Sequence, residues 1–146
     1  MTNSVFLYSI AFVIVIVCVL ILLLIKRNRN NNIEREPMEG AEFENYCALL
    51  LEDNGFEEVH QTPVSHDFGC DIIAKKDHIT YGIQCKSYST PVGISAIQQA
   101  YAGKDFYDCM VGAVMTNSTF TAPAREMADK LKVVLWDGQT LEQMEE

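Results

Sequence analysis

Residues 67–86 read DFGCDIIAKKDHITYGIQCK, and this stretch decides the fold that we expect for the chain. A short, mostly apolar run is followed by polar, turn-like residues near Asp77, and a second run then resumes with partial alternation. This pattern predicts a β-hairpin. Antiparallel pairing about a turn at Asp77 would bring Asp71 opposite a residue in the segment 82–84.

Three polar side chains are expected to converge at one end of this hairpin. The carboxylate of Asp71 and the amide oxygen of Gln84 are hard ligands of the kind that Mg²⁺ prefers. The ammonium of Lys86 can orient a water, help to deprotonate it, or neutralise a phosphate. Each residue alone also has an ordinary role: a solvated lysine, an exposed glutamine, or an aspartate that caps the turn after Gly69. Their joint spacing favours a site.

The composition divides the chain into two parts. Of 146 residues, 49% are hydrophobic, but the N-terminus is almost entirely apolar and the remainder suits one small domain. From residue 33 onward there are eight basic and 20 acidic residues, a net charge of −12. A broad basic face that coats nucleic acid is therefore not expected, and any affinity for nucleic acid should be sensitive to salt.

The cysteines and histidines do not form a metal or disulfide pattern. The five cysteines are odd in number and include no C-x-x-C, which argues against a disulfide framework or a zinc knuckle. Cys47, Cys85 and Cys109 fall in apolar patterns and are expected to be small core residues in a reducing compartment. The histidines at 60, 66 and 78 lack metal spacing and are expected at the surface or in loops.

The segment 5–25 contains no charged residue and is long enough to cross a hydrocarbon core of roughly 30 Å as a helix. A cleaved signal peptide is the alternative, but the start carries no basic residue and no small-residue cleavage site follows. We therefore predict an uncleaved, single-pass anchor over residues 1–27. The basic residues at 26–29 predict that the following domain is cytoplasmic, at the cell membrane.

A polar linker at 28–37 precedes a domain at 38–146, whose remaining pattern alternates between helices and strands. The expected helices are 38–54, 93–107, 121–130 and 139–144, and the expected strands outside the hairpin are 56–62, 108–116 and 132–136. The apolar run at 108–116 suits a strand covered on both faces. The pattern predicts an α/β fold in which a mixed sheet is flanked by helices.

Two of these helices carry further expectations. In the first, Glu44 lies beside the apolar face, either as a solvated acid of an early turn or as a second carboxylate over the hairpin. In the helix 93–107, the first element after the hairpin, the larger apolar residues are expected on the buried side: Ile94, Ile97, Tyr101 and Phe106. Residues 116–118 are expected to form a loop and to cap the helix that follows.

Residues 38–141 contain an ordered set of short motifs that resembles the Mrr-like restriction endonuclease domain, a branch of the PD-(D/E)xK nuclease superfamily. The matching pieces are GAEFE at 40–44, DFGCD at 67–71, QCK at 84–86, IQQ at 97–99, MTNSTFTAPA at 115–124 and LWDG at 135–138. Single pieces such as D-x-G-x-D or Q-x-K are weak signals. Their common order is a strong one.

The resemblance implies a restriction-endonuclease-like sheet and Mg²⁺-dependent or Mn²⁺-dependent cutting of a DNA phosphodiester. Asp71 would be the metal-binding acid and Lys86 the motif lysine. Gln84 would stand where the wider superfamily has an acid, and Glu44 would be the glutamate of the first helix. The backbone carbonyl of Cys85 would complete part of the metal shell.

The same resemblance implies supporting roles for Gln98, near the site, and for Asp67 and Gly69 in the loop that sets the metal-binding acid. Cutting of both DNA strands by one small site would favour a homodimer. The acidic charge leaves two alternatives open. One is a non-catalytic module on the nuclease fold that binds nucleic acid or a protein. The other is an enzyme that acts on RNA or on a DNA junction.

Overall fold

The computed structural model describes residues 38–63 and 68–146, together with the helical residues Val17 and Ile21. The chain divides into two compact units, Met1–Arg35 and Glu36–Glu146. Apart from Val17 and Ile21, the predicted membrane segment 5–25 lies outside the described residues, as does the linker 28–37. Within the described ranges, no helix combines the length and the apolar character that a membrane span requires.

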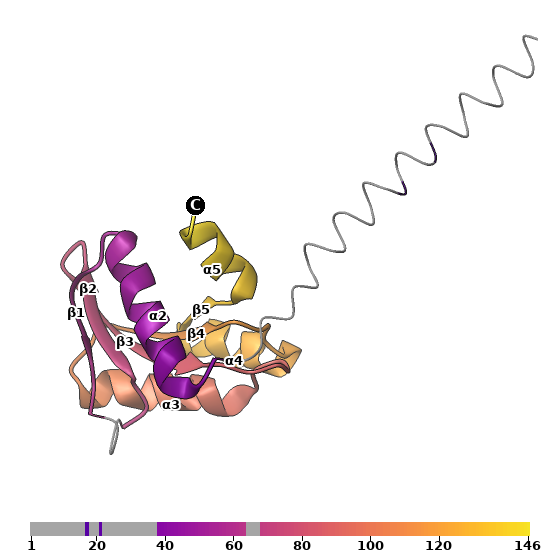
Figure 1. The fold of residues 1–146 in the computed structure, drawn as a ribbon. Coiled ribbons are helices and arrows are strands. Elements are labelled where there is room, and N and C mark those ends of the chain that lie inside the picture. The colour runs from indigo at the N-terminus through magenta and orange to yellow at the C-terminus, as the bar shows by residue number, and fades with distance from the viewer. Residues whose placement is uncertain (1–16, 18–20, 22–37, 64–67) are drawn as a thin grey trace, which may run out of the picture. The chain divides into compact units, whose positions relative to one another are not determined.

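The second unit is built on one mixed sheet of five strands in the order β1-β2-β3-β4-β5 (Figure 1). The strands β1, β2 and β3 pair antiparallel, whereas β3, β4 and β5 pair parallel. The strands are β1 (Glu57–Gln61), β2 (Ile72–Lys76), β3 (Ile79–Lys86), β4 (Val111–Thr116) and β5 (Val134–Trp136). The predicted mixed sheet is confirmed.

The predicted hairpin is the β2–β3 pair. Lys76 pairs with Ile79, so Asp77 and His78 form a two-residue turn between them. Both turn residues have positive φ, 50° and 67°, as the tight turns that match the right-handed twist of a hairpin require. The turn thereby fixes the register of the whole hairpin, and with it the position of every polar residue along both strands.

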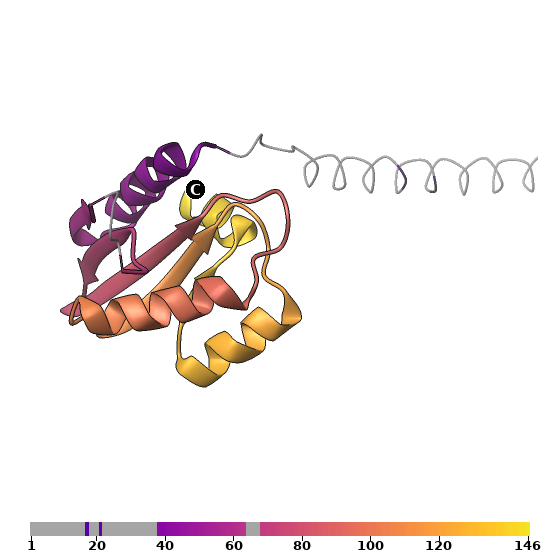
Figure 2. The ribbon, with the colours of Figure 1, turned by 90° about the horizontal axis from the view of Figure 1, so that it is seen from below.

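The helices cover both faces of the sheet (Figure 2). They are α2 (Gly40–Asp53), α3 (Ile94–Phe106), α4 (Ala122–Leu131) and α5 (Gly138–Met144). The helices α2 and α5 pack with Ile83 and Cys85 of β3 and Met115 of β4 in one core cluster. The helices α3 and α4 pack with Val114 of β4 in the other. Strand β4 is therefore covered on both faces, as its apolar run predicts.

The predicted buried face of α3 is wrong in part. Ile97 is buried, but Tyr101 and Phe106 are exposed, and the rest of the buried face consists of small residues, namely Ala96, Ala100 and Gly103. The helix backbone lies too close to the sheet for large rings: a Cβ on Gly112 of β4 would stand 3.0 Å from the carbonyl oxygen of Ala100. Periodicity of large apolar residues could not reveal a contact made by small ones.

The helix caps also differ from the prediction at one point. The helix α4 begins at Ala122, and its N-cap is Thr121, whose hydroxyl accepts a hydrogen bond from the amide of Ala124 at 3.3 Å. Thr116 is the last residue of β4, whereas residues 117–118 form the predicted loop, and they brace the segment 88–90 instead of capping the helix. Asp137, at the end of β5, caps α5 by accepting from the amide of Thr140 at 3.1 Å.

Candidate active site

The backbone of Asp71 is held from both sides, although β2 begins only at the next residue. Its amide donates to the carbonyl of Ile83 at 2.8 Å, and its carbonyl accepts from the amide of Thr62 at 2.9 Å. The hydroxyl of Thr62 also donates to the carbonyl of Cys70 at 2.7 Å. These bonds tie the residue between β1 and β3, so the direction of its side chain is set by the sheet.

The Asp71 carboxylate is buried, with 7% of the residue exposed. Its Oδ2 accepts a hydrogen bond from the amide of Cys85 at 2.6 Å and another from Nε2 of Gln84. Ile72 pairs with Ile83, which places Asp71 and Gln84 next to each other across the hairpin. Such charge-assisted bonds favour the ionised carboxylate and fix its orientation. The structure therefore brings Asp71 and Gln84 together as the sequence predicts.

Gln84 presents its nitrogen, not its oxygen, to Asp71. The residue is only 2% exposed, so its amide is held between β3 and the layer formed by α3 and α4. To share an ion with Asp71, Gln84 would have to rotate by a half-turn about χ3, its terminal side-chain torsion. This rotation exchanges the positions of the amide nitrogen and oxygen. That torsion is soft compared with a rotation about Cα–Cβ.

Lys86 is the last residue of β3 and lies on the same face of the strand as Gln84, two residues earlier. It is half-buried and pairs in register with Thr116 of β4. Lys86 forms no hydrogen bond or ion pair with the part of the chain that the structure describes. Its ammonium is thus available to a ligand at the end of the sheet.

Most other cations of the described residues are already paired. Lys75 contacts Glu58, Lys104 contacts Asp105, Arg125 contacts Asp137 and Lys132 contacts Asp129, and the ammonium of Lys76 donates to a backbone carbonyl. These pairs neutralise most of the few basic groups in an acidic domain. Lys86 stands out because the residue is half-buried, has no ion pair among the described residues, and lies on the strand next to a buried carboxylate.

Glu44 lies on α2 and is half-buried. The pKa of the Cys85 thiol is raised well above its ordinary value, chiefly by a hydrogen bond with Cys47 and by burial. The negative charges of Asp71 and Glu44 raise it further. Both carboxylates therefore lie within electrostatic reach of the same residue of β3, Glu44 from the α2 layer and Asp71 from the hairpin.

Gly69 allows the loop before Asp71 to pack directly on α3. Its φ is +93°, and a Cβ there would stand 2.3 Å from the carbonyl oxygen of Gln99. Phe68 precedes it, also with positive φ, and stacks on Phe106 at a ring distance of 3.9 Å. The loop thus reaches α3 at Gln99.

The supporting residues predicted around this loop have different outcomes. Gln98 is exposed, and the described residues give it no hydrogen bond to the site. Asp67, with His66, lies outside the described residues. His60 and His78 are exposed, as predicted, and Cys47, Cys85 and Cys109 are buried free thiols.

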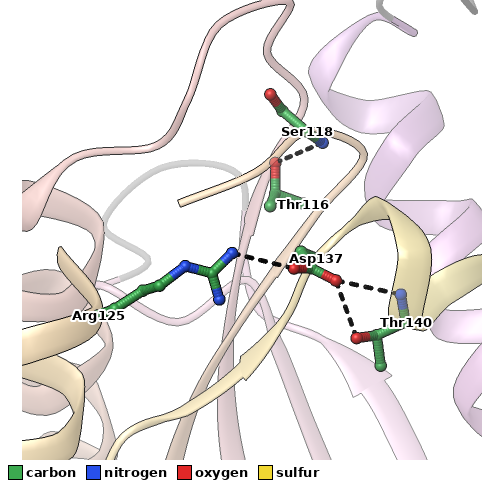
Figure 3. Close-up of polar contacts among 5 residues, drawn as sticks. All are labelled: Thr116, Ser118, Arg125, Asp137 and Thr140. Atoms are coloured by element: carbon green, nitrogen blue, oxygen red, sulfur yellow. Dashed lines mark hydrogen bonds and ion pairs between the residues drawn. The ribbon is translucent and has the colours of Figure 1, made fainter. Parts of the chain in front are cut away.

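A further group of polar contacts lies at the ends of the parallel strands, and sequence reasoning did not assign it (Figure 3). The hydroxyl of Thr116 accepts from the amide of Ser118 at 3.1 Å, and Asp137 accepts from Arg125 at 3.1 Å while it caps α5. Burial alone would raise the pKa of Asp137, but hydrogen bonds from Thr140 and Arg125 outweigh it and lower the pKa. The signal was present in the motifs at 115–124 and 135–138.

The domain is a mixed sheet between two helical layers, with a buried aspartate just before β2 and a lysine at the end of the neighbouring β3. The model of the Mrr_cat family, described as restriction endonuclease, matches residues 35–144. The chain therefore belongs to the Mrr_cat restriction endonuclease family, and this domain is an endonuclease domain by family.

Two solved structures share the fold. A protein of unknown function, AF1548, is 21% identical with a TM-score of 0.58, over 70% of this chain and 64% of that one. The DNA modification-dependent restriction endonuclease AspBHI is 14% identical with a TM-score of 0.52, over 78% of this chain. The present chain spans 32% of AspBHI, so it corresponds to only part of that protein. No curated protein matches the chain.

Proposed function

We propose that the protein is a membrane-tethered, Mg²⁺-dependent DNA endonuclease that hydrolyses phosphodiester bonds. The observation that carries the proposal is the position of the buried Asp71 carboxylate. It is bound to Gln84 and to the backbone of Cys85, and β3 ends one residue later at the unpaired Lys86. An acid, an amide and an amine on two adjacent strands form the minimum set for metal-assisted hydrolysis of a phosphodiester.

The donor chemistry at this end of the hairpin fits a hard divalent ion. Among the residues that the structure describes, no three His, Cys, Asp or Glu side chains gather around one point. The carboxylates of Asp71 and Glu44 would therefore be completed by oxygens of another kind, the Gln84 amide and the Cys85 carbonyl. Mg²⁺ accepts such a mixed oxygen set and keeps several waters, and Mn²⁺ suits the same ligands.

Each residue of the chain has a defined part in the proposed reaction. A bound Mg²⁺ supplies an acidified water and neutralises charge on the phosphate. Asp71 and Glu44 provide the negative charge that holds the ion. Lys86 orients the attacking water or binds a phosphate oxygen, because its ammonium has no partner among residues 38–63 and 68–146. Before an ion binds, Gln84 keeps the Asp71 carboxylate in place through its hydrogen bond.

The charge distribution supports an interface in which the domain contacts few DNA phosphates instead of many. Since most basic side chains are bound to acids or carbonyls of the same domain, Lys86 is the strongest candidate to meet a phosphate. Few phosphate contacts imply weak binding without metal. A homodimer would supply the second site that cutting of both strands requires.

The membrane tether rests on the sequence of residues 5–25 and the basic residues that follow. It places the nuclease domain in the cytoplasm at the cell membrane. Alkaline extraction of cell membranes tests the anchor: the full chain should stay with the membrane at its full mass. Release of a shortened chain into the soluble fraction would support a cleaved signal peptide instead.

Cleavage of plasmid DNA by the full chain in detergent tests the activity. We expect nicking or cutting that requires Mg²⁺ or Mn²⁺, stops with a chelator, and is lost in Asp71→Ala and Lys86→Ala. Equal activity of wild type and both variants would mean that the cleavage comes from a contaminant. A panel of duplex, methylated, branched and RNA substrates would then define the substrate.

The net charge of −12 favours one alternative, a non-catalytic module that binds nucleic acid or a protein through the nuclease fold. This alternative predicts binding without turnover under any divalent metal. Metal-dependent turnover that Asp71→Ala abolishes would exclude it.

A further inference from the structure

The hydroxyl of Ser87 is exceptional within the described part of the chain. Its Oγ is buried and has no hydrogen-bond partner, and no other buried side-chain nitrogen or oxygen of the described residues lacks one. Buried polar atoms in folded proteins are almost always hydrogen-bonded, because an unpaired atom has lost its hydrogen bonds to water and has gained none in the protein. The exception falls directly after Lys86, at the end of β3.

A loosely held segment does not explain the unpaired hydroxyl. The backbone immediately after Ser87 is fixed: the amide of Tyr88 donates to Oδ1 of Asn117 at 2.9 Å, and the hydroxyl of Ser118 donates to the carbonyl of Thr90 at 2.9 Å. The two polar side chains that hold this segment, those of Asn117 and Ser118, both have partners. Ser87 is held in place with its hydrogen-bonding capacity unused.

The loop that contains Asn117 and Ser118 is itself held to the end of β4. The amide of Ser118 donates to the hydroxyl of Thr116, and Thr116 pairs with Lys86 across β3 and β4 (Figure 3). The motif at 115–124 therefore supports the segment that follows Lys86. The position of Ser87 is then fixed relative to Lys86 by two strands and a braced loop.

Ser87 as a residue is half-buried, although its Oγ is not accessible. A rotation about χ1 can move the hydroxyl from the dry side to the exposed side. That rotation breaks no hydrogen bond, so little opposes it. A ligand that offers an acceptor beside Lys86 would therefore gain the full hydrogen bond, because no group in the described part of the chain competes for the donor.

We propose that Ser87 is a substrate-binding residue whose hydroxyl donates a hydrogen bond to a non-bridging phosphate oxygen of the DNA strand that contacts Lys86. This inference rests on the proposed function, since it takes DNA as the ligand. A phosphate oxygen is anionic and accepts strongly, and a neutral hydroxyl beside an ammonium adds direction to the contact. The hydroxyl is useful here because an acidic domain has few other donors for a phosphate.

The test compares Ser87→Ala with Ser87→Thr, which keeps a hydroxyl, and with Ser89→Ala, an exposed serine two residues further on. The dissociation constant of a fluorescent DNA duplex is measured with the full chain at low salt in EDTA. KM and kcat for cleavage are measured with Mg²⁺. The thermal midpoint of each variant is followed in parallel through Trp136.

We expect Ser87→Ala to raise both the dissociation constant and KM by roughly tenfold or more, as the loss of a hydrogen bond to a charged group does. Its thermal midpoint should not fall, because the lost hydroxyl has no partner among the described residues. Ser87→Thr should restore binding, and Ser89→Ala should resemble wild type. Unchanged binding by Ser87→Ala, or weaker binding that only follows a lower thermal midpoint, would overturn the proposal.

The two proposals can fail separately. If wild type cleaves DNA and Ser87→Ala binds it equally well, the phosphate contact is wrong and the nuclease function stands. If wild type never cleaves but Ser87→Ala still weakens duplex binding, the contact stands and the activity is wrong. Absence of any DNA binding by wild type overturns both.

Discussion

Replacement of Gly69 by alanine tests whether the loop before Asp71 is set by its close contact with α3. Gly69 has a φ of +93°, and an added Cβ would stand 2.3 Å from the carbonyl oxygen of Gln99. The positive φ alone costs a non-glycine residue about 1–2 kcal/mol. The overlap is with helix backbone, which cannot move aside cheaply, and overpacking of this kind adds about 1–3 kcal/mol.

Gly55→Ala is the matched control. Gly55 also has positive φ, +78°, but an added Cβ there would meet nothing within 4 Å. Its cost should therefore be the backbone term alone, about 1–2 kcal/mol. The difference between the two variants isolates the steric contact between the loop and α3.

The fluorescence of Trp136 is a suitable probe of unfolding. It is the single tryptophan of the chain and packs edge-on against Phe56, with Tyr81 beside it. At about 4–8 °C per kcal/mol, Gly69→Ala should lower the thermal midpoint by about 8–40 °C and Gly55→Ala by about 4–16 °C, and the shift should be larger in Gly69→Ala by at least about 4 °C. Equal shifts in the two variants would refute the contact with Gln99 as the reason for the glycine.

Three further outcomes follow from the site and its surroundings. Lys86→Met should reduce the rate of DNA cleavage by at least about 100-fold. The free energy of unfolding should change by less than about 0.5 kcal/mol, because the lysine has no partner among the described residues to lose. A matching loss of stability would contradict this. Asp137→Asn should be less stable than wild type at neutral pH. The difference in stability should shrink as the pH falls below 3.8, the ordinary pKa of an aspartate, because a carboxyl whose pKa is lowered in the folded state loses its stabilising effect there. A difference that persists in acid would show that the ion pair is not the cause. Cys85 should resist iodoacetamide at about pH 8 in the folded protein and react once urea unfolds it, since Cys47 and burial keep the thiol protonated. Labelling is measured by the mass of the peptide that contains Cys85. Rapid labelling of the native chain would count against this prediction.

The hairpin and the mixed sheet could be predicted from sequence because local rules determine them. The polar turn near Asp77 and the alternation that follows leave one register in which the apolar residues share a face. The pattern predicts Asp71 opposite a residue in the segment 82–84, and the observed register places it beside Gln84. The alternation of helices and strands after the hairpin predicts parallel strands with crossover helices.

What sequence could not supply was close packing and hydrogen bonding at a distance. The helix α3 approaches the sheet through Ala100 and Gly103, and small residues give no strong apolar period. The bond from the Cys85 amide to Asp71 depends on the exact position of one strand end, and so does the unpaired hydroxyl of Ser87. No pattern of residue types distinguishes Gln98 from Gln99, yet only the latter meets the loop at Gly69.

The alternation along β3 has a consequence for how such a chain can change over generations. Ile83 and Cys85 fill one core while Gln84 and Lys86 face the opposite side, so structural and chemical residues are interleaved along a single strand. Deleting or inserting one residue at Asp77 and His78 would slip the pairing by one place and exchange the two sets. Natural variation in the length of this turn should therefore occur in steps of two residues. A protein in which the turn changed by one residue would lose both the packing of its core and the polar residues of its candidate site.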